Sequence, residues 1–410
     1  MDIISNSLIN KHKKANYYKY PISAPIFDKK EVNSALNSIL KLQISQGTKV
    51  KEFENKFKNY IGMDYAIATN SGSSANLLIL QSLKEIYNLK KGDEVIIPST
   101  TFATVIMPII QLDLKPVLID VSSENFNMIE NNIKAALTKK TKILMIVHTL
   151  GLACNMDMIL NICKKNKLLL FEDCCEAHGS KFKGKKVGSF GIVSAFSFFV
   201  AHNITTGDGG IALTKNKKIF EKIRSLREFG RIQNYNKRWV NKKNLKDFDI
   251  KYIFNNIGYN MRMGDIQASF GIEQLKKLDK FNKKRNINAN FFDKNFIKHP
   301  LNKYFQTTTY DKKISYHSYY TYAITIKKNK YFKRIDLIKF LEKNGVETRP
   351  IFCGSIPDQP FMQNVKIKKT NLKNSQYIRD NSFFIGIHPG FTRQDLIKII
   401  SFFKKFINKF

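Results

Sequence analysis

Three short segments of the 410-residue chain carry residue types that can hold an anion, balance a cation and move a proton. In "TNSGSSANLL", the residues Ser71 to Ser74 lie between an apolar run and a helical pattern, where N–H groups and hydroxyls can hold a phosphate. In "LLLFEDCCEAHGS", Asp173 ends a very apolar run and needs a cationic or hydrogen-bonding partner. A protonated pyridine nitrogen is such a partner, and cofactors that act as electron sinks need one. In "FSFFVAHNITTGDGG", His202 can take up and release a proton near neutral pH.

Each segment also has a structural explanation. Serine often caps a helix, and an aspartate after a strand can do the same. Phe102 in "PSTTFATV" can cover the face of a cofactor or belong to the core, and Ser197 can add a hydroxyl to a phosphate-binding loop. Asn260 and Arg262 lie on a turn before a helical pattern. Alone none of these residues identifies a site, whereas their order along the chain is specific.

The elements that position these residues follow from the hydrophobic pattern. Between residues 65 and 214, short apolar runs alternate with helical patterns: "YAIATNS", "DEVIIPST", "KPVLIDV", "TKILMIVHT", "KLLLFEDCC", "SAFSFF" and "GIALT". Runs of this kind predict a mostly parallel sheet that is covered on both faces, and therefore an α/β fold. Functional groups gather at the carboxyl ends of such strands, where most of the polar segments lie.

The pattern changes after residue 214. A long helix is predicted over 265–296, and a smaller C-terminal α+β unit is predicted over 286–410, after a large unit over 1–285. The last helix, "RQDLIKIISFFKKFINKF", is basic and amphipathic, and we expect its apolar face to pack on the small unit rather than on a membrane.

Composition excludes several classes of protein. The net charge of +36 comes from 59 lysines and ten arginines spread along the whole chain, which argues against a dedicated nucleic-acid interface but allows attraction of an anionic substrate. The five cysteines are odd in number, so a disulfide framework is not expected. We find no secretory signal and no apolar run of membrane-spanning length, and we expect a soluble cytoplasmic protein with no membrane partner.

The ordered segments resemble the sugar aminotransferase (DegT/DnrJ/EryC1/StrS) family of pyridoxal-phosphate (PLP) enzymes over about residues 20–405. They are "TNSGSSANLL", "PSTTFATVIMPI", "KPVLIDV", "FEDCCEAHGS", "FSFFVAHNITTGDGG", "GYNMRMGDIQASFGIEQL" and "ETRP". The resemblance implies an aspartate aminotransferase-like fold, PLP fold type I, in which 1–285 is the PLP-binding domain and 1–20 an N-terminal arm. It also implies a homodimer with shared active sites, to which Asn260 contributes in trans. The implied cofactor-binding residues are Gly72, Ser73, Ser74, Phe102, Asp173, Glu176, Ser197 and Asn260.

His202 occupies the position at which this family carries the lysine that binds the cofactor covalently. An imidazole cannot form an imine with the cofactor aldehyde, so PLP and pyridoxamine phosphate (PMP) would be held non-covalently, with His202 as the catalytic residue. This replacement, with "VHTLG" and "TRPIFCGSIPDQPF", resembles the NDP-4-keto-6-deoxyhexose 3-dehydratases. The implied substrate-binding residues are His148, Arg349, Gly354 and Ser355, although Ser355 stands where asparagine is usual.

One branch of that subgroup carries an iron–sulfur cluster on four cysteines, three of them clustered downstream of the histidine. Only Cys353 follows His202 here, and "GRIQNYNKRWV" occupies the region of the expected ligands, so we expect no metal and place the chain in the cluster-free, colitose-type branch.

The resemblance then implies a lyase of deoxysugar biosynthesis for lipopolysaccharide or capsule. L-glutamate converts PLP to PMP, and the enzyme removes the C3 hydroxyl of a nucleotide-linked 4-keto-6-deoxy sugar with release of ammonia. Two alternatives stay open: an aminotransferase that uses a displaced lysine among Lys181, Lys183, Lys185 and Lys186, and a non-catalytic binding protein with the same fold.

Overall fold

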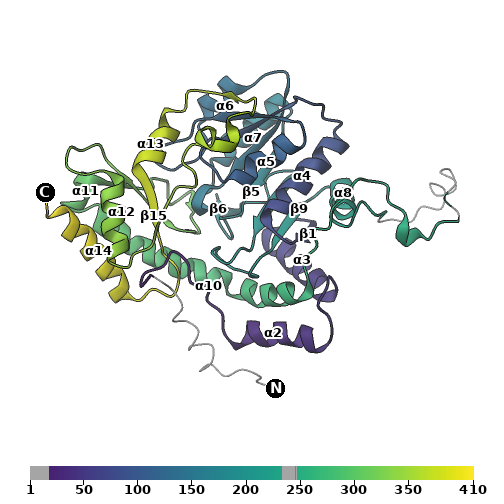
Figure 1. Ribbon diagram of the computed structural model, residues 1–410, viewed down its shortest axis with the longest axis horizontal. Coiled ribbons are helices and arrows are strands. Elements are labelled where there is room, and N and C mark those ends of the chain that lie inside the picture. The colour runs from purple at the N-terminus through teal and green to yellow at the C-terminus, as the bar shows by residue number, and fades with distance from the viewer. Residues whose placement is uncertain (1–17, 233–244, 246) are drawn as a thin grey trace.

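A computed structural model describes residues 18–232, 245 and 247–410 (Figure 1). Most of the predicted N-terminal arm over 1–20 lies outside the described residues. So does most of "GRIQNYNKRWV", the segment used to argue against clustered thiolate ligands.

An eight-stranded sheet with the order β1-β9-β8-β5-β4-β2-β3-β14 forms the centre of the molecule (Figure 1). Every neighbouring pair from β8 to β14 is parallel, whereas β9 is antiparallel to β1 and β8. The predicted mostly parallel sheet is thus confirmed. All seven apolar runs form strands of it: β1 (Tyr65–Thr69), β2 (Glu94–Pro98), β3 (Lys115–Ile119), β4 (Thr141–Val147), β5 (Leu169–Asp173), β8 (Val193–Ser197) and β9 (Gly210–Thr214).

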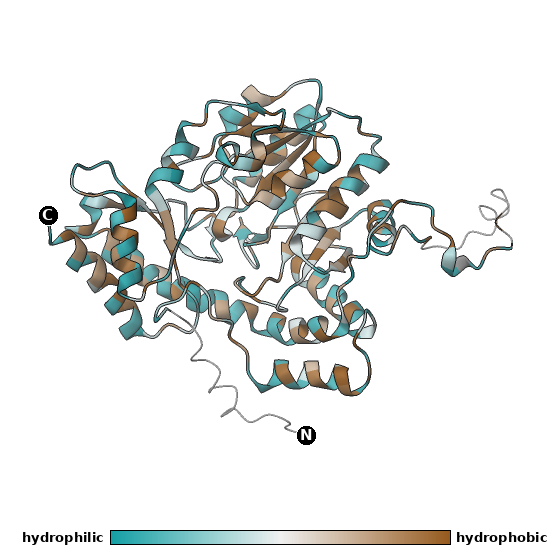
Figure 2. Cartoon of the chain, in the orientation of Figure 1, coloured by the Kyte–Doolittle hydropathy of each residue, from teal (hydrophilic) through white to brown (hydrophobic). Residues whose placement is uncertain are grey.

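Helices cover both faces of this sheet because the strands are apolar on both sides (Figure 2). In β2, Ile96 packs into one hydrophobic cluster, while Val95 and Ile97 pack into the other. The first cluster lies under α3 (Thr48–Ile61), α7 (Met156–Asn166) and α10 (Asp265–Phe296), and α2 (Lys29–Leu40) packs against α10. The second lies under α4 (Gly72–Ile86), α5 (Ala103–Gln111) and α8 (Lys217–Arg227). Helix α6 (Glu130–Ala136) also packs into the first cluster, through Ile133 and Ala136.

The C-terminal part has its own antiparallel sheet in the order β10-β12-β15-β13, which confirms the smaller α+β unit. The strands are β10 (Phe305–Thr307), β12 (Tyr322–Ile326), β13 (Thr348–Pro350) and β15 (Ser382–Ile385), and the helices are α11 (Leu301–Tyr304), α12 (Arg334–Lys343), α13 (Lys373–Asn381) and α14 (Arg393–Ile407). The apolar face of α14 packs into this unit through residues such as Leu396 and Phe403, as expected. No helix of the described residues has the length and hydrophobicity to cross a membrane.

Two features bear on the predicted division at residue 285. Helix α10 runs without interruption across it, and β14 (Lys368–Lys369), from the C-terminal part, pairs with β3 at the edge of the large sheet. The division at 285 stays a prediction. A small hairpin of β6 (Lys181–Phe182) and β7 (Lys185–Lys186) completes the fold by pairing with β11 (Ser315–Tyr316).

Candidate active site

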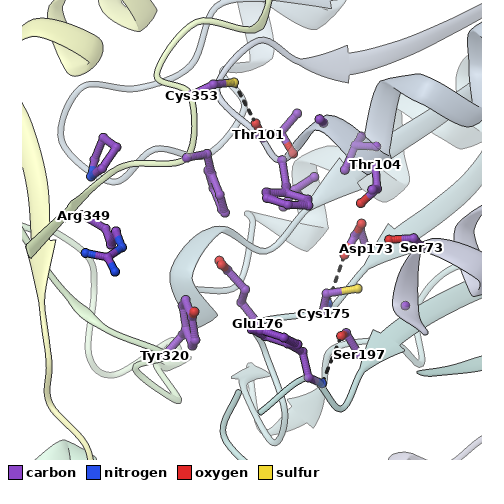
Figure 3. Close-up of a pocket in the computed structure, with 18 of the residues that line it drawn as sticks. Ser73, Thr101, Thr104, Asp173, Cys175, Glu176, Ser197, Tyr320, Arg349 and Cys353 are labelled. Atoms are coloured by element: carbon purple, nitrogen blue, oxygen red, sulfur yellow. Dashed lines mark hydrogen bonds between the residues drawn. The ribbon is translucent and has the colours of Figure 1, made fainter. Parts of the chain in front are cut away.

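A cavity of about 1150 Å³ opens at the carboxyl ends of the parallel strands. Val147, Asp173 and Ser197, the last residues of β4, β5 and β8, all line it. In Figure 3, Ser73, Asp173, Cys175 and Ser197 lie on one side of the cavity and Tyr320 and Arg349 on the other, with Glu176 between them. The cavity thus lies at the strand ends, where the sequence placed most of the polar segments.

The first turn of α4 forms one wall of the cavity through Gly72 and Ser73. The helix begins there because Ser71 is its N-cap, in an extended conformation, and Ser71 Oγ accepts the N–H of Ser74 at 3.1 Å. Gly72 is required at this point, since a Cβ there would lie 2.6 Å from Cβ of Ser197 and 3.1 Å from Sγ of Cys175. Helix N–H groups and the Ser197 hydroxyl thus converge on one end of the cavity. Ser74 does not line the cavity and pairs with Ser71.

Asp173 lies beside this wall and is 4% exposed. Its Oδ2 accepts a hydrogen bond from Asn76 Nδ2 at 2.9 Å and its Oδ1 accepts the Cys175 N–H at 3.0 Å. Both oxygens keep free lone pairs for a further donor. Sequence reasoning missed Asn76 and Cys175, although Asn76 is a polar residue one turn after Gly72 on the same face of an apolar helix.

His202 lies in the loop between β8 and β9 and lines the cavity, half-buried. Its ring is 5.3 Å from the Tyr320 ring and 6.0 Å from the His178 ring, between centroids. Burial, and then the charge of Arg285, lower the pKa of His202 to about 3. The side chain is therefore neutral near pH 7 and can accept a proton.

Glu176 and Phe102 also face the cavity. Burial raises the pKa of Glu176 to about 8, and the nearby Asp173 charge adds to this effect, while the Leu150 N–H donated to Oε2 at 2.9 Å opposes it. Glu176 is thus largely protonated at neutral pH. Phe102, the N-cap residue of α5, is 58% exposed, so it is not the core aromatic that was the alternative.

Arg349, Gly354 and Ser355 come from the C-terminal part of the chain. Arg349 lines the cavity and pairs through Nη2 with Glu347 Oε1 at 2.7 Å. Gly354 also lines it, with φ +69, whereas Ser355 is buried outside the lining. Arg334 and Arg379 lie on the same wall and were not predicted, because no local pattern distinguishes them from surface arginines.

Besides Ser74 and Ser355, two more predicted residues, Asn260 and His148, do not line the cavity. Asn260 is exposed, its Oδ1 accepts from Arg262 Nε at 3.0 Å, and its backbone bridges Glu228. Any contact that it makes with a cofactor therefore requires a second chain or a different arrangement.

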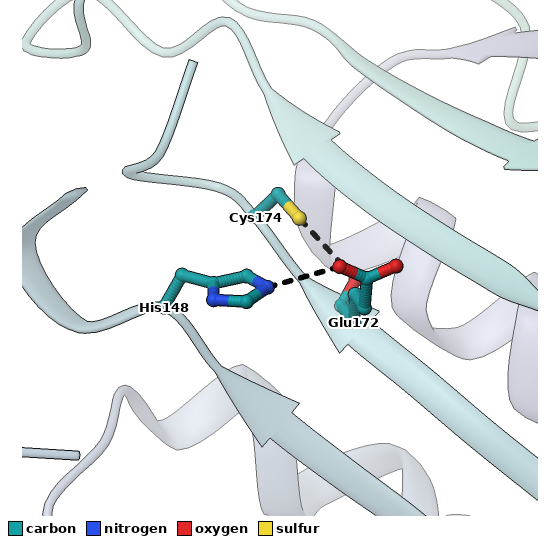
Figure 4. A group of neighbouring side chains, drawn as sticks. All are labelled: His148, Glu172 and Cys174. Atoms are coloured by element: carbon teal, nitrogen blue, oxygen red, sulfur yellow. Dashed lines mark hydrogen bonds and ion pairs between the residues drawn. The ribbon is translucent and has the colours of Figure 1, made fainter. Parts of the chain in front are cut away.

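His148 is fully buried, with Nε2 at 3.1 Å from Glu172 Oε2 and Nδ1 accepting the Cys154 N–H at 3.1 Å (Figure 4). Both ring nitrogens of His148 are engaged and the side chain has no exposed surface. The expectation that His148 contacts the substrate is therefore wrong for this arrangement. His148, Glu172 and Cys174 have ligand-type atoms within 4.8 Å of one another. However, Glu172 also accepts three backbone N–H groups, from Gly188, Phe190 and Gly191. The group is therefore accounted for as a buried hydrogen-bond network.

The lysines considered as substitutes for a covalent anchor lie on the β6–β7 hairpin. Lys183 pairs with Asp157, and Lys186 donates to the carbonyl of Tyr60. No lysine of the described residues lines the cavity. The donor set thus fits a ligand that has a phosphate for the α4 end, a protonated ring nitrogen for Asp173 and an aromatic face for Phe102.

Residues 26–404 match the model of the DegT/DnrJ/EryC1/StrS aminotransferase family. Among similar proteins, the lipopolysaccharide biosynthesis protein RfbH of Salmonella typhimurium is 34% identical, covering 94% of this chain and 91% of that protein. The GDP-4-keto-6-deoxy-D-mannose 3-dehydratase of Escherichia coli O55:H7 is 32% identical over 90% of this chain and 95% of that protein. The GDP-perosamine synthase of Escherichia coli O157:H7 is 33% identical over 79% and 81%.

A solved structure of a variant of the GDP-4-keto-6-deoxymannose-3-dehydratase ColD with bound GDP-perosamine superimposes with a TM-score of 0.86. It is 28% identical and covers 94% of this chain and 100% of that one. This similarity confirms the predicted aspartate aminotransferase-like fold.

Proposed function

Because this chain belongs to the DegT/DnrJ/EryC1/StrS aminotransferase family, we propose that it is a PLP- and PMP-dependent 3-dehydratase. Its substrate would be a nucleotide-linked 4-keto-6-deoxy sugar, from which it removes the C3 hydroxyl with L-glutamate as amino donor. The reaction would serve deoxysugar biosynthesis, in keeping with the similarity to a lipopolysaccharide biosynthesis protein.

The observation that carries this proposal is the imidazole of His202 in a cavity whose described lining contains no lysine. A transaminase needs an amine that captures the cofactor at the end of each cycle, and an imidazole cannot form that bond. It can, however, still transfer protons.

The residues at the α4 end fit the cofactor. Gly72, Ser73 and Ser197 would bind its phosphate, Asp173 would keep its ring nitrogen protonated, and Phe102 would cover its ring. When bound as PMP, the cofactor supplies the amine that condenses with the C4 ketone and the ring that accepts electrons as the C3 hydroxyl leaves.

The remaining steps belong to the protein. The neutral His202 accepts a proton from the reacting carbon and returns it to the departing hydroxyl, which leaves as water. The protonated Glu176 donates a hydrogen bond into the cavity, and Arg349 and Gly354 contact the sugar nucleotide. No lysine intercepts the product amine, which is hydrolysed to a ketone and ammonia.

The test is incubation of the chain with PLP, glutamate and a panel of 4-keto-6-deoxy sugar nucleotides, read by mass spectrometry and by an ammonia assay. A 3-deoxy product with equimolar ammonia supports the proposal, and the His202→Asn variant should form none. A stable 4-amino sugar without ammonia would instead identify an aminotransferase, the second candidate, which the 33% identity to a GDP-perosamine synthase favours. Absence of turnover with every substrate would favour a non-catalytic binding protein.

We propose further that the chain acts as a homodimer. The exposed position of Asn260 suits a residue that completes the phosphate site of a neighbouring subunit.

A further inference from the structure

Arg285 is a buried cation in the middle of α10 and is 3% exposed. Its Nη1 donates to the carbonyl oxygens of Tyr319 at 3.1 Å and Tyr320 at 2.7 Å, while its Nε has no acceptor among the described residues. No described carboxylate forms an ion pair with it. A guanidinium that is buried without a counterion is costly, so its position requires an explanation.

On α10, Asn282 lies three residues before Arg285 and four residues before Asn286, so its side chain neighbours both of theirs. Asn282 Nδ2 donates to the carbonyl of His178 at 2.7 Å, and Asn282 Oδ1 accepts from Asn203, the residue after His202, at 3.0 Å. Asn286 Nδ2 donates to the carbonyl of His317 at 2.9 Å. We call Asn282, Arg285 and Asn286 the α10 ridge.

The ridge therefore ties together the three segments that surround His202. These segments are the loop of His202 itself, the turn that carries His178 and the segment that carries Tyr320. The rings of His178 and Tyr320 both lie close to the His202 ring. Nδ1 of His202 and both ring nitrogens of His178 are buried and have no hydrogen-bond partner among the described residues. No acceptor is thus in place to stabilise a proton on Nδ1 of His202.

We propose that Arg285 is a positioning residue that holds the Tyr320 segment against His202. Its buried charge adds to the effect of burial in keeping the His202 imidazole neutral. The inference rests on the proposed function in one respect, because the proposed function assigns His202 as the proton carrier. Destabilising the imidazolium makes it a stronger acid toward the departing hydroxyl and makes the neutral ring a weaker base toward the reacting carbon. The stronger acidity suits a reaction whose leaving group is poor.

Other titratable groups also surround His202. They are His178 and Glu176 after β5, Tyr320 before β12, and Asp173 and Asp208 at the cavity wall. Burial, and then the charge of Arg285, depress the pKa of His202, and burial and His202 depress that of His178. Glu176 is largely protonated at neutral pH, so it carries little negative charge that could oppose the effect of Arg285 on the pKa of His202.

The experiment measures the pKa of His202 directly by imidazole NMR of the full chain without cofactor, with the His202→Asn variant to assign the signals. In the unmodified protein we expect His202 to remain neutral below pH 5. Arg285→Gln, which removes the charge but keeps a donor for the carbonyls, should raise the pKa of His202 measurably, while the burial of the ring still holds it below the ordinary value of an imidazole. Arg285→Lys should raise it less, and Arg393→Gln, an exposed arginine on α14, should leave it unchanged.

With the active enzyme, the acid limb of the kcat/KM profile should move to higher pH in Arg285→Gln and largely return in Arg285→Lys. An unmodified His202 with a pKa near 6.5, or an unchanged pKa in folded Arg285→Gln, would overturn the inference. If Arg285→Gln does not fold, the comparison of the unmodified protein with Arg285→Lys decides, and an unchanged pKa of His202 in folded Arg285→Lys overturns the inference. The NMR readout needs no substrate, so a shifted pKa without dehydration would refute only the proposed function, and dehydration with an unshifted pKa would refute only the role of Arg285.

Discussion

The close approach of Gly72 to Ser197 makes a sharp test of the proposed phosphate site. In Gly72→Ala, the new Cβ would lie 2.6 Å from Cβ of Ser197, whereas such carbons are normally about 3.5–4.0 Å apart. The first turn of α4 or the end of β8 must therefore retreat by about 1 Å. A phosphate held between them would lose at least one donor, because a hydrogen bond lengthened by about 1 Å no longer forms.

The size of the effect follows from that loss. A hydrogen bond to a charged group is worth about 1.5–3 kcal/mol, so Gly72→Ala should bind PLP about 10- to 150-fold more weakly. Overpacking should also cost about 1–3 kcal/mol of stability. Equilibrium dialysis with PLP measures the first effect and thermal unfolding of the cofactor-free chain the second.

Gly191→Ala is the matched control. Its Cβ would lie 2.6 Å from the carbonyl oxygen of Leu170, an equally tight contact, but Gly191 does not line the cavity. Both variants should lose stability, and only Gly72→Ala should lose affinity for PLP. If the two variants bind PLP equally well, the α4 end of the cavity does not hold the phosphate.

Three further predictions follow from the same site. In His202→Lys, borohydride should fix PLP to residue 202, and the 3-deoxy product should largely disappear. The unmodified chain, treated with borohydride in the same way, should release its cofactor on dialysis. A cofactor fixed to any lysine of the unmodified chain would contradict the proposal. Because the pKa of Glu176 is raised to about 8 in the fold, this carboxyl group holds more protons in the folded state than in the unfolded state between about pH 4.5 and 8. The contribution of Glu176 to stability should therefore fall as pH rises through this window, so the difference in stability between the unmodified cofactor-free chain and Glu176→Gln should shift in favour of the variant over a series of urea titrations. If sites are shared, mixing inactive His202→Asn and Asn260→Ala chains should restore part of the activity after subunit exchange; activity that stays absent despite exchange, or an active monomer in sedimentation, would remove Asn260 from the site.

The sheet and much of the cavity were predictable because they depend on local patterns. Continuous apolar runs specify strands that are buried on both faces, and the carboxyl ends of those strands must converge, which brings Asp173 and Ser197 to the first turn of α4. The same rule failed for His148. It places the backbone at the end of β4, but successive side chains point to opposite faces, so Val147 faces the cavity and His148 faces Glu172.

Residues brought in from distant parts of the chain could not be predicted in the same way. Arg285 contacts the Tyr320 segment from a 32-residue helix, where it binds the carbonyls of Tyr319 and Tyr320, and Tyr320 lines the cavity. Neither residue belongs to a sequence motif from which its contacts in the fold could be predicted. The sequence pattern also does not state which hydroxyl in "SGSS" faces the cavity and which, like Ser74, completes the helix cap.

The pairing of β14 with β3 has a consequence for how this chain can be divided. Lys368 and Lys369 lie opposite Val117 and Leu118, so the C-terminal part covers the open edge of an apolar strand of the large sheet. A fragment that ended at residue 285 would leave the backbone N–H and C=O groups of β3 unpaired on that side, and such an edge readily recruits strands of other chains. The two lysines that now form the rim end the sheet with charge, which discourages further addition. A chain shortened at residue 285 would therefore expose this edge, and an exchange of either part between proteins would need a substitute for that strand.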